Sequence, residues 1–249
     1  HRKAHNIYGM QMARATYDGV KRFARNKRSL VITRSGYSGL QRYSSVWTGD
    51  NIATWEHLSI ANLQVQRLCA SGISFCGSDV GGFIDQPSGE LFVRWVQLAA
   101  FHPFFRTHSS GDHGDQEPWS FGLDNMKLAK RFIELRYELL LYFYTTFYQY
   151  SKDARPMIKS LVIHDTTDEE SKNRMDESIV GDHILVCPML QPGVHERILY
   201  LPTEQWYNYW TDELFDGRQE TTVKADLTQM PIFIKAGAII PKIPVMQYV

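Results

Sequence analysis

The sequence repeats one pattern: a short apolar segment leads into a loop with a polar residue and then into a segment with helical spacing of apolar residues. The apolar segments at residues 29–33, 73–76 and 101–105 have the length of buried strands. Alternating strands and helices predict a parallel sheet with helices outside it. In such a sheet the residues that follow the strands gather at one end. The polar residues after the strands are therefore the first candidates for function.

Four polar residues occupy this position: Arg34, Asp50, Asp79 and His108. Arg34 directly follows the first strand, so its guanidinium needs a partner, and a carboxylate in the same cleft is the natural one. Asp79 lies among glycines in the segment Gly77-Ser78-Asp79-Val80-Gly81-Gly82-Phe83. There it either supplies turn chemistry or contacts a substrate hydroxyl or charge.

Asp50 lies near the end of a long loop, which runs from Thr33 to Asn51. A loop of this length is uncommon inside a compact domain unless it is functional. A Gly-Asp-Asn sequence on its own is typical of a turn. Trp47 stands close by, however, and an aromatic wall desolvates a carboxyl group in a way that suits a general acid. We therefore expect Asp50 to be a catalytic acid, with Arg34 in the same cleft.

The second part of the chain has a different pattern. After about residue 176, short strand-like segments alternate with turns such as Pro192-Gly193 and Asp216-Gly217. Short strands at this spacing predict an antiparallel β-sandwich. The sequence thus predicts an α/β domain over residues 1–175, an all-β domain over residues 176–249, and a polar joint just before the second domain.

The composition excludes several classes of partner. Lysine plus arginine and aspartate plus glutamate number 27 each, which argues against nucleic acid or an anionic membrane surface as a partner. No apolar run is long enough to span a bilayer. The cysteines at positions 69, 76 and 187 are scattered in apolar segments, so we expect buried thiols and neither a disulfide framework nor a zinc site.

Two further patterns have alternative interpretations. The segment Thr107-His108-Ser109-Ser110-Gly111-Asp112-His113 is similar to a zinc motif of metallo-β-lactamases, but Ser110 replaces the middle histidine. Since a zinc site normally needs at least three protein ligands, we expect no metal here. Trp206, Tyr207, Tyr209 and Trp210 form either a sugar-binding face or part of the core, and alternating aromatics on a strand favour the core.

An ordered series of motifs spans nearly the whole chain. The motifs are Asn6-Ile7-Tyr8-Gly9, Thr33-Arg34-Ser35, Trp47-Thr48-Gly49-Asp50-Asn51, Gly77-Ser78-Asp79-Val80-Gly81-Gly82-Phe83, Arg94-Trp95-Val96-Gln97, Phe104-Phe105-Arg106-Thr107-His108, Gln116-Glu117-Pro118-Trp119, Arg136-Tyr137-Glu138-Leu139-Leu140, Gly181-Asp182-His183-Ile184-Leu185-Val186 and Ala236-Gly237-Ala238-Ile239-Ile240-Pro241. Together they resemble glycoside hydrolase family 31, in its α-glucosidase branch.

This resemblance implies a fold and a set of roles. The fold would be the C-terminal half of a (β/α)8 TIM barrel followed by an antiparallel β-sandwich. Asp50 would be the general acid/base of a retaining enzyme that needs no metal or other cofactor. The side chains of Arg34, Asp79 and His108 would hold hydroxyls of the bound sugar. Its apolar walls would be Trp47 and Phe83.

One motif of the family is missing from the 249 residues. The nucleophile of the family is an aspartate in a Trp-x-Asp-Met-Asn-Glu motif at the end of the fourth barrel strand, and no such motif occurs here. A retaining mechanism needs two carboxylates. We therefore expect the chain to be a fragment of a longer polypeptide, inactive alone, whose remainder completes the barrel and supplies the nucleophile.

The expected function is that of an exo-acting α-glucosidase, which removes terminal α-linked glucose from an oligosaccharide or disaccharide. α-Xylosidase and α-transglucosylase activities of the same family remain alternatives. A non-catalytic carbohydrate-binding fragment is a third, because the chain contains only one of the two carboxylates.

Overall fold

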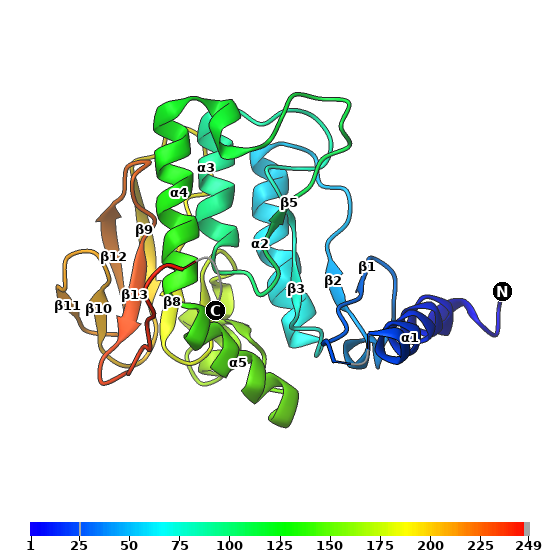
Figure 1. Cartoon of the computed structure of the whole chain (residues 1–249). Helices are drawn as coiled ribbons and strands as arrows, with labels where there is room; N and C mark the ends of the chain where they lie inside the picture. Colours follow the sequence, from blue (N-terminus) through cyan, green and yellow to red (C-terminus); the bar gives the residue numbers. More distant parts are fainter. Residues whose placement is uncertain (25, 247–249) are drawn as a thin grey trace.

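The structure, a computed structural model, describes residues 1–24 and 26–246. Its first part alternates short strands with helices (Figure 1). In chain order these are α1 (His5–Phe23), β1 (Ile32–Thr33), β2 (Ser45–Trp47), α2 (Trp55–Ala70), β3 (Cys76–Gly77), β4 (Asp79–Val80), α3 (Gly89–Ala99), β5 (Arg106–Thr107), α4 (Leu123–Glu138) and α5 (Leu140–Asp153). Short 3₁₀ helices at Leu40–Arg42 and Pro118–Phe121 lie in the loops.

The strands of this part pair in parallel and in chain order. β1 pairs with β2, and β2 pairs with β3. β4 pairs with β5 in a register that places Asp79 opposite Arg106. Only Ser78 separates β3 from β4, so the two short strands together connect β2 with β5. This order is that of half of a βα barrel, and it confirms the predicted fold class.

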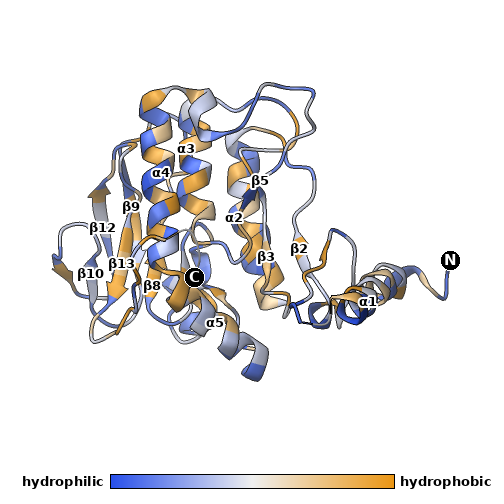
Figure 2. Ribbon diagram, viewed as in Figure 1, coloured by the Kyte–Doolittle hydropathy of each residue, from blue (hydrophilic) through white to orange (hydrophobic). Residues whose placement is uncertain are grey.

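The helices differ in how much of their surface is buried. From Leu91 to Ala99 every residue of α3 is buried, because α3 lies between the parallel strands and the antiparallel sheet (Figure 1). Figure 2 shows the matching apolar colouring along α3 and on β8 and β13. Two helices begin at side-chain caps, because Thr54 accepts from the backbone N–H of His57 and Ser88 accepts from that of Leu91.

The helical spacing of apolar residues predicts a single helix over residues 125–150. This prediction is wrong, because the chain forms two helices, α4 and α5, with a break at Leu139. The backbone carbonyl of Glu138 accepts a hydrogen bond of 3.0 Å from the N–H of Ile243, a residue of the C-terminal segment. A carbonyl that bonds outside the helix interrupts the helical hydrogen-bond series. No pattern local to residues 125–150 signals this contact.

The second part of the chain is an antiparallel sheet with a separate two-stranded ribbon. The sheet has the order β11-β10-β13-β8-β7-β6, and the ribbon pairs β12 with β9. The elements are β6 (Ile158–Ser160), α6 (Leu161–His164), a 3₁₀ helix (Glu170–Asn173), β7 (Ser178–Val180), β8 (Ile184–Val186), β9 (Glu196–Leu201), β10 (Trp206–Asn208), β11 (Leu214–Phe215), β12 (Gln219–Lys224) and β13 (Ile232–Lys235). β6 belongs to the sheet although it precedes residue 176, where the sequence analysis places the start of the second domain. That boundary stays a prediction.

The two parts share one apolar core. Leu58 on α2, Val96 on α3 and Phe132 on α4 belong to the same buried cluster as Ile184 and Ile232 of the sheet. A second, smaller cluster lies wholly within the β part and contains Leu185, Trp206 and Phe233. Helices α2, α3 and α4 therefore pack against the second part, and each part stabilises the other.

Arg94 connects the two parts through hydrogen bonds. It lies on α3 and is only 2% exposed. Its Nη1 donates to the carbonyl of Gln229 at 2.8 Å, and its Nη2 donates to the carbonyls of Val194 and Ala225 at 3.3 Å each. Gln97 adds a bond of 2.8 Å to the carbonyl of Leu227. Buried carbonyls without a donor are costly, so this guanidinium anchors the loops of the β part on α3.

All three cysteines are buried free thiols, as the sequence predicts. Cys69 and Cys76 lie side by side, with 3.9 Å between their sulfur atoms. Among the residues that the structure describes, no helix has the length and apolar character needed to cross a membrane.

We expect the substitution Arg94→Met to lower the stability of the chain strongly. Methionine fills much of the same space but leaves the carbonyls of Val194, Ala225 and Gln229 without their donor. The cost is about 3 kcal/mol or more. Thermal unfolding should therefore show a Tm lower by roughly 6–12 °C.

The matched control is Arg14→Met, at an arginine on α1 whose side chain is 53% exposed. Exposed ion pairs contribute little, so its Tm should change by no more than about 2 °C. Equal Tm values for the two variants would show that Arg94 does not anchor the β part.

Candidate active site

The predicted site residues lie where the parallel strands end. Arg34 follows β1, Trp47 ends β2, and His108 follows β5. Asp79 begins β4, opposite Arg106 on β5. Because these strands run in the same direction, their ends bring side chains from distant parts of the chain to one edge of the sheet.

Arg34 and Asp50 form an ion pair. Nη1 of Arg34 lies 3.2 Å from Oδ1 of Asp50 and 3.1 Å from its Oδ2. The side chain of Asp50 is 37% exposed, so the carboxyl group is open to a ligand while it is held by the guanidinium. The guanidinium also lies 6.0 Å from the ring centroid of Trp47. The prediction that Arg34 has a carboxylate partner is met by Asp50.

The turn that presents Asp50 is fixed by its neighbours. Gly49 has φ +88°, a conformation that glycine adopts without strain. Thr48 donates from its hydroxyl to Oδ1 of Asn51 at 2.7 Å. The backbone carbonyl of Asn51 in turn accepts from the N–H of Phe83 at 2.6 Å and from that of Ile84 at 3.0 Å. The loop with the acid is thus joined to the Gly-rich loop.

Phe83 and His108 face each other across two loops. Their ring centroids are 5.1 Å apart. The N–H of Ser110 donates to the carbonyl of Phe83 at 2.9 Å, which holds the loop after β5 against the loop after β4. Partial burial and the nearby Arg106 lower the pKa of His108, so the neutral imidazole is favoured and can both donate and accept a hydrogen bond.

Asp79 is fully buried, in contrast to Asp50. Its side chain is 0% exposed, and its Oδ1 accepts from Nη2 of Arg106 at 3.2 Å. Its Oδ2 is buried without a hydrogen-bond partner among the described residues. Burial raises the pKa of Asp79 to about 6, and the Arg106 guanidinium opposes this rise. A carboxylate in this position is held by a cation but is not open to solvent.

Arg106 was not among the residues that the sequence singled out. Its guanidinium lies 5.3 Å from the ring centroid of Trp47 and 5.4 Å from that of Phe104. The sequence could have indicated Arg106, because it directly follows the apolar segment at residues 101–105, just as Arg34 follows the segment at residues 29–33. The argument that a strand-end arginine needs a carboxylate partner applies equally to both.

The glycines of the loop after β4 are required by close packing. Gly82 has φ +93°, and a Cβ on it would lie 2.6 Å from the backbone of Ala53. Gln116 donates from its side-chain amide to the carbonyl of Gly82 at 2.9 Å, which adds another bond between the loops after β4 and β5. Asp79 and Phe83 are therefore presented by a loop with little freedom to move.

Two cavities adjoin Arg34. One, of about 350 Å³, is lined by Arg34, Trp47 and residues of α2. The other, of about 790 Å³, is lined by the start of α1 together with Arg34, Ser35 and Gly36. Space for a ligand therefore exists on both sides of the arginine that holds Asp50.

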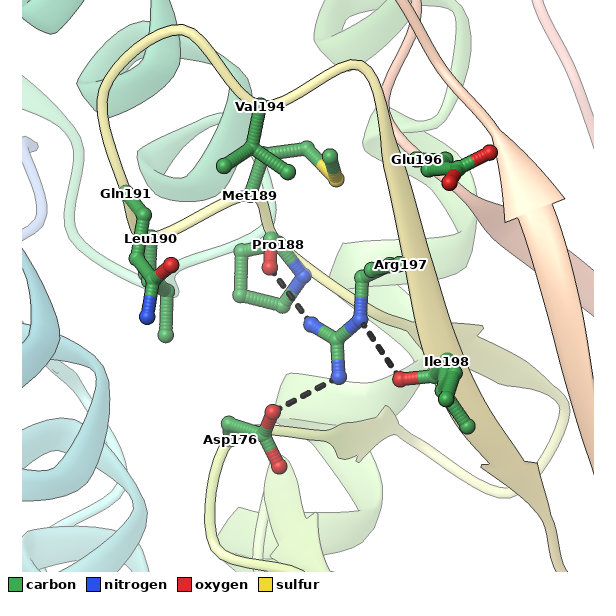
Figure 3. A pocket seen from close by; sticks show the side chains of 9 residues that line it. All are labelled: Asp176, Pro188, Met189, Leu190, Gln191, Val194, Glu196, Arg197 and Ile198. Carbon is green, nitrogen blue, oxygen red and sulfur yellow. Dashed lines mark hydrogen bonds and ion pairs between the residues drawn. The ribbon is translucent and has the colours of Figure 1, made fainter.

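A further cavity lies in the β part, near residues 188–198 (Figure 3). Its volume is about 280 Å³. The guanidinium of Arg197 already donates to the carboxylates of Asp176 and Glu177 and to the carbonyl of Pro188. These partners occupy the guanidinium, and none of the residues that line the cavity is one of the predicted site residues, so we do not regard it as the functional site.

Two other sequence patterns are the segment similar to a zinc motif and the aromatic cluster at residues 206–210. No group of three or more histidine, cysteine, aspartate or glutamate side chains able to hold a metal occurs within residues 1–24 and 26–246. Trp206 is fully buried, and Trp210 donates from its indole N–H to the carbonyl of Met230 at 2.7 Å. Tyr207, by contrast, is 41% exposed. The aromatic cluster is thus mainly core.

Comparison with known proteins gives consistent matches over both parts. Residues 1–146 match the glycosyl hydrolases family 31 TIM-barrel domain, and residues 154–240 match the glycosyl hydrolase family 31 C-terminal domain. Alpha-glucosidase 2 of Bacillus thermoamyloliquefaciens is 42% identical over 240 residues, which cover 96% of this chain and 30% of that protein. Neutral alpha-glucosidase AB of Sus scrofa is 38% identical over 97% of this chain and 26% of its own length.

Solved structures agree with these relatives. A family 31 dextranase of Flavobacterium johnsoniae, complexed with isomaltotriose, superposes with a TM-score of 0.91 at 30% identity and covers 99% of this chain. The glucosidase II alpha subunit superposes with a TM-score of 0.92 at 30% identity and covers 95% of this chain. The chain spans 32% and 26% of these two proteins, respectively. The strand-end site and the paired domain matches lead to one conclusion: this chain belongs to glycosyl hydrolase family 31.

Proposed function

We propose that this chain carries the acid/base half of a retaining, exo-acting α-glucosidase site, which removes terminal α-linked glucose from oligosaccharides. The observation that carries the proposal is the Arg34–Asp50 pair, which lies beside Trp47 at the ends of adjacent parallel strands. The relatives named for alpha-glucosidase and the dextranase complexed with isomaltotriose support glucose as the substrate unit.

Asp50 is the proposed general acid/base. In the first step it donates its proton to the glycosidic oxygen as that bond breaks, and in the second step it takes a proton from the attacking water. Its exposure gives the leaving group access to the carboxyl oxygens, and Arg34 fixes their direction.

The nucleophile is the second group that the mechanism requires, at about 5–5.5 Å from the acid. Asp79 is not suited to this role, because its carboxylate is fully buried and paired with Arg106. We propose that the nucleophile comes from a part of the parent polypeptide outside these 249 residues. The chain then contributes one carboxylate and most of the surrounding wall.

The remaining residues bind the sugar in this proposal. Arg34 and His108 donate to or accept from hydroxyls, and Trp47 and Phe83 provide apolar faces that pack against the ring. The predicted contact of Asp79 with a hydroxyl stays a prediction, and in the described structure the side chain of Asp79 is fully buried and paired with Arg106.

A second candidate is a non-catalytic carbohydrate-binding function. It is favoured by the presence of only one accessible carboxylate among the predicted site residues, Asp50. α-Xylosidase and α-transglucosylase activities stay open as well, because they use the same acid/base. Turnover of an aryl α-glucoside by the product of the full gene separates catalysis from binding alone.

We expect Asp50→Asn, in the product of the full gene, to lower kcat/KM on maltose by roughly 10²- to 10⁴-fold. The loss of kcat/KM should be much smaller on p-nitrophenyl α-glucoside, because kcat/KM reports the first step and this leaving group departs with little need of a proton. Steady-state kinetics on both substrates measures the difference. The matched control is Asp18→Asn, at an exposed carboxylate of α1, which should retain full activity on both. Full turnover of maltose by Asp50→Asn would end the acid/base assignment.

We also expect the first product to keep the configuration of the substrate. A two-carboxylate mechanism with a covalent intermediate inverts the anomeric carbon twice, so α-glucose is released first. ¹H NMR of the reaction during the first minutes distinguishes α- from β-glucose before mutarotation mixes them. Initial release of β-glucose would show an inverting enzyme and exclude the proposed roles.

A further inference from the structure

Asp79 and Asp50 differ sharply in their environments. The side chain of Asp79 is 0% exposed, whereas that of Asp50 is 37% exposed. A sugar hydroxyl cannot reach a fully buried carboxylate without displacing the groups that cover it. The side chain of Arg106, which pairs with Asp79, is 29% exposed and lies between Asp79 and the aromatic wall.

Arg106 connects Asp79 to Trp47. Asp79 and Arg106 are direct partners in the pairing of β4 with β5, so the backbone sets their separation. Beyond Asp79, the guanidinium of Arg106 lies 5.3 Å from the ring centroid of Trp47. Arg34, the partner of Asp50, approaches the same ring at 6.0 Å. The position of the Trp47 ring therefore depends on two arginines, each held by its own aspartate.

We propose that Asp79 is a positioning residue, which holds Arg106 against Trp47 and thereby sets the orientation of the aromatic wall beside Asp50. On this basis the sugar meets the Trp47 wall and not the carboxylate of Asp79. The inference rests on the proposed α-glucosidase site. It assigns a new role to Asp79 and adds Arg106 to the residues of that site.

Energetics supports a functional reason for the pair. A buried ion pair is a poor source of stability unless its remaining polar atoms are also satisfied. Here Oδ2 of Asp79 and Nε of Arg106 are both buried without partners among the described residues. An incompletely satisfied pair next to a cleft is a candidate for function, since stability alone does not account for it.

The charges around Asp79 act in both directions. Burial and the charge of Asp50 raise the pKa of Asp79, whereas Arg106 and Arg34 lower it, with a result of about 6. Above this pH the ionised carboxylate holds Arg106 strongly, and below it the neutral acid holds Arg106 weakly. His108 lies on the segment after β5 and faces Phe83, so it is a further titratable group at this edge, beside Asp50.

The first test compares substrates in the product of the full gene. Asp79→Asn and Arg106→Lys should each lower kcat/KM on p-nitrophenyl α-glucoside by roughly 100-fold, because a misplaced wall misaligns the sugar. The same factor should hold for the 2-, 3-, 4- and 6-deoxy glucosides. A direct hydroxyl contact instead predicts one deoxy substrate on which Asp79→Asn costs nothing, and that result would overturn the proposal. Arg106→Lys keeps the positive charge but removes the guanidinium that lies against the Trp47 ring. Full activity in that variant would therefore also overturn the proposal.

The second test needs no turnover, so it separates this proposal from the proposed function. The fluorescence of Trp47 is obtained as the difference between each protein and the same protein with Trp47→Phe. In the parent protein this contribution should change with a midpoint near pH 6, the pKa given by burial of Asp79. In Asp79→Asn the transition should be absent, and in Asp18→Asn it should persist.

A transition that survives in Asp79→Asn would refute the positioning role, even in a protein active on α-glucosides. An inactive protein that shows the expected fluorescence would refute only the α-glucosidase function. Tm values confirm that each variant is folded.

Discussion

The parallel register of five short strands is the constraint on which the site depends. Each strand is only two or three residues long, so its pairing determines where the next few side chains lie. Trp47 is opposite Gly77, and Asp79 is opposite Arg106. A register error of one residue would turn each side chain to the other face of the sheet. The ion pair of Arg34 with Asp50, 16 residues apart in the sequence, exists only because β1 and β2 are adjacent.

Much of this arrangement could be predicted from the sequence, because parallel βα units place their polar residues by a general rule. The rule located Arg34, Asp50, Asp79 and His108, but it does not report how deep a side chain lies. Asp79 is buried and paired with Arg106, and at the helix break the carbonyl of Glu138 accepts from Ile243, more than 100 residues away. Contacts of this range leave no local pattern. The inclusion of β6 in the second sheet likewise follows from its pairing with β7 and not from its composition.

Charge balance at the site follows from the same geometry. Two arginines approach the ring of Trp47, and each of them is paired with its own aspartate. The two pairs differ in exposure, and this difference separates their chemistry. In the proposed site the exposed carboxyl group of Asp50 exchanges a proton with the substrate, whereas the buried one of Asp79 holds Arg106. One sequence pattern, a carboxylate after a strand, therefore occurs in two different environments.

The β part supports the site through the helices that lie between them. α3 contacts loops of the β part and precedes β5, the strand that contains Arg106 and leads to His108. Arg94 on this helix donates to three carbonyls of the β part. Arg136 of α4 donates to the carbonyls of Ala100 and Pro103 in the turn that follows α3. The turn that leads into β5 is thus held from the helix layer, and the helix layer is held by the sheet. A chain with the barrel strands but without the β part would leave Arg94 and Gln97 of α3 without their carbonyl partners, and the helix layer that holds the turn before β5 would lose this support.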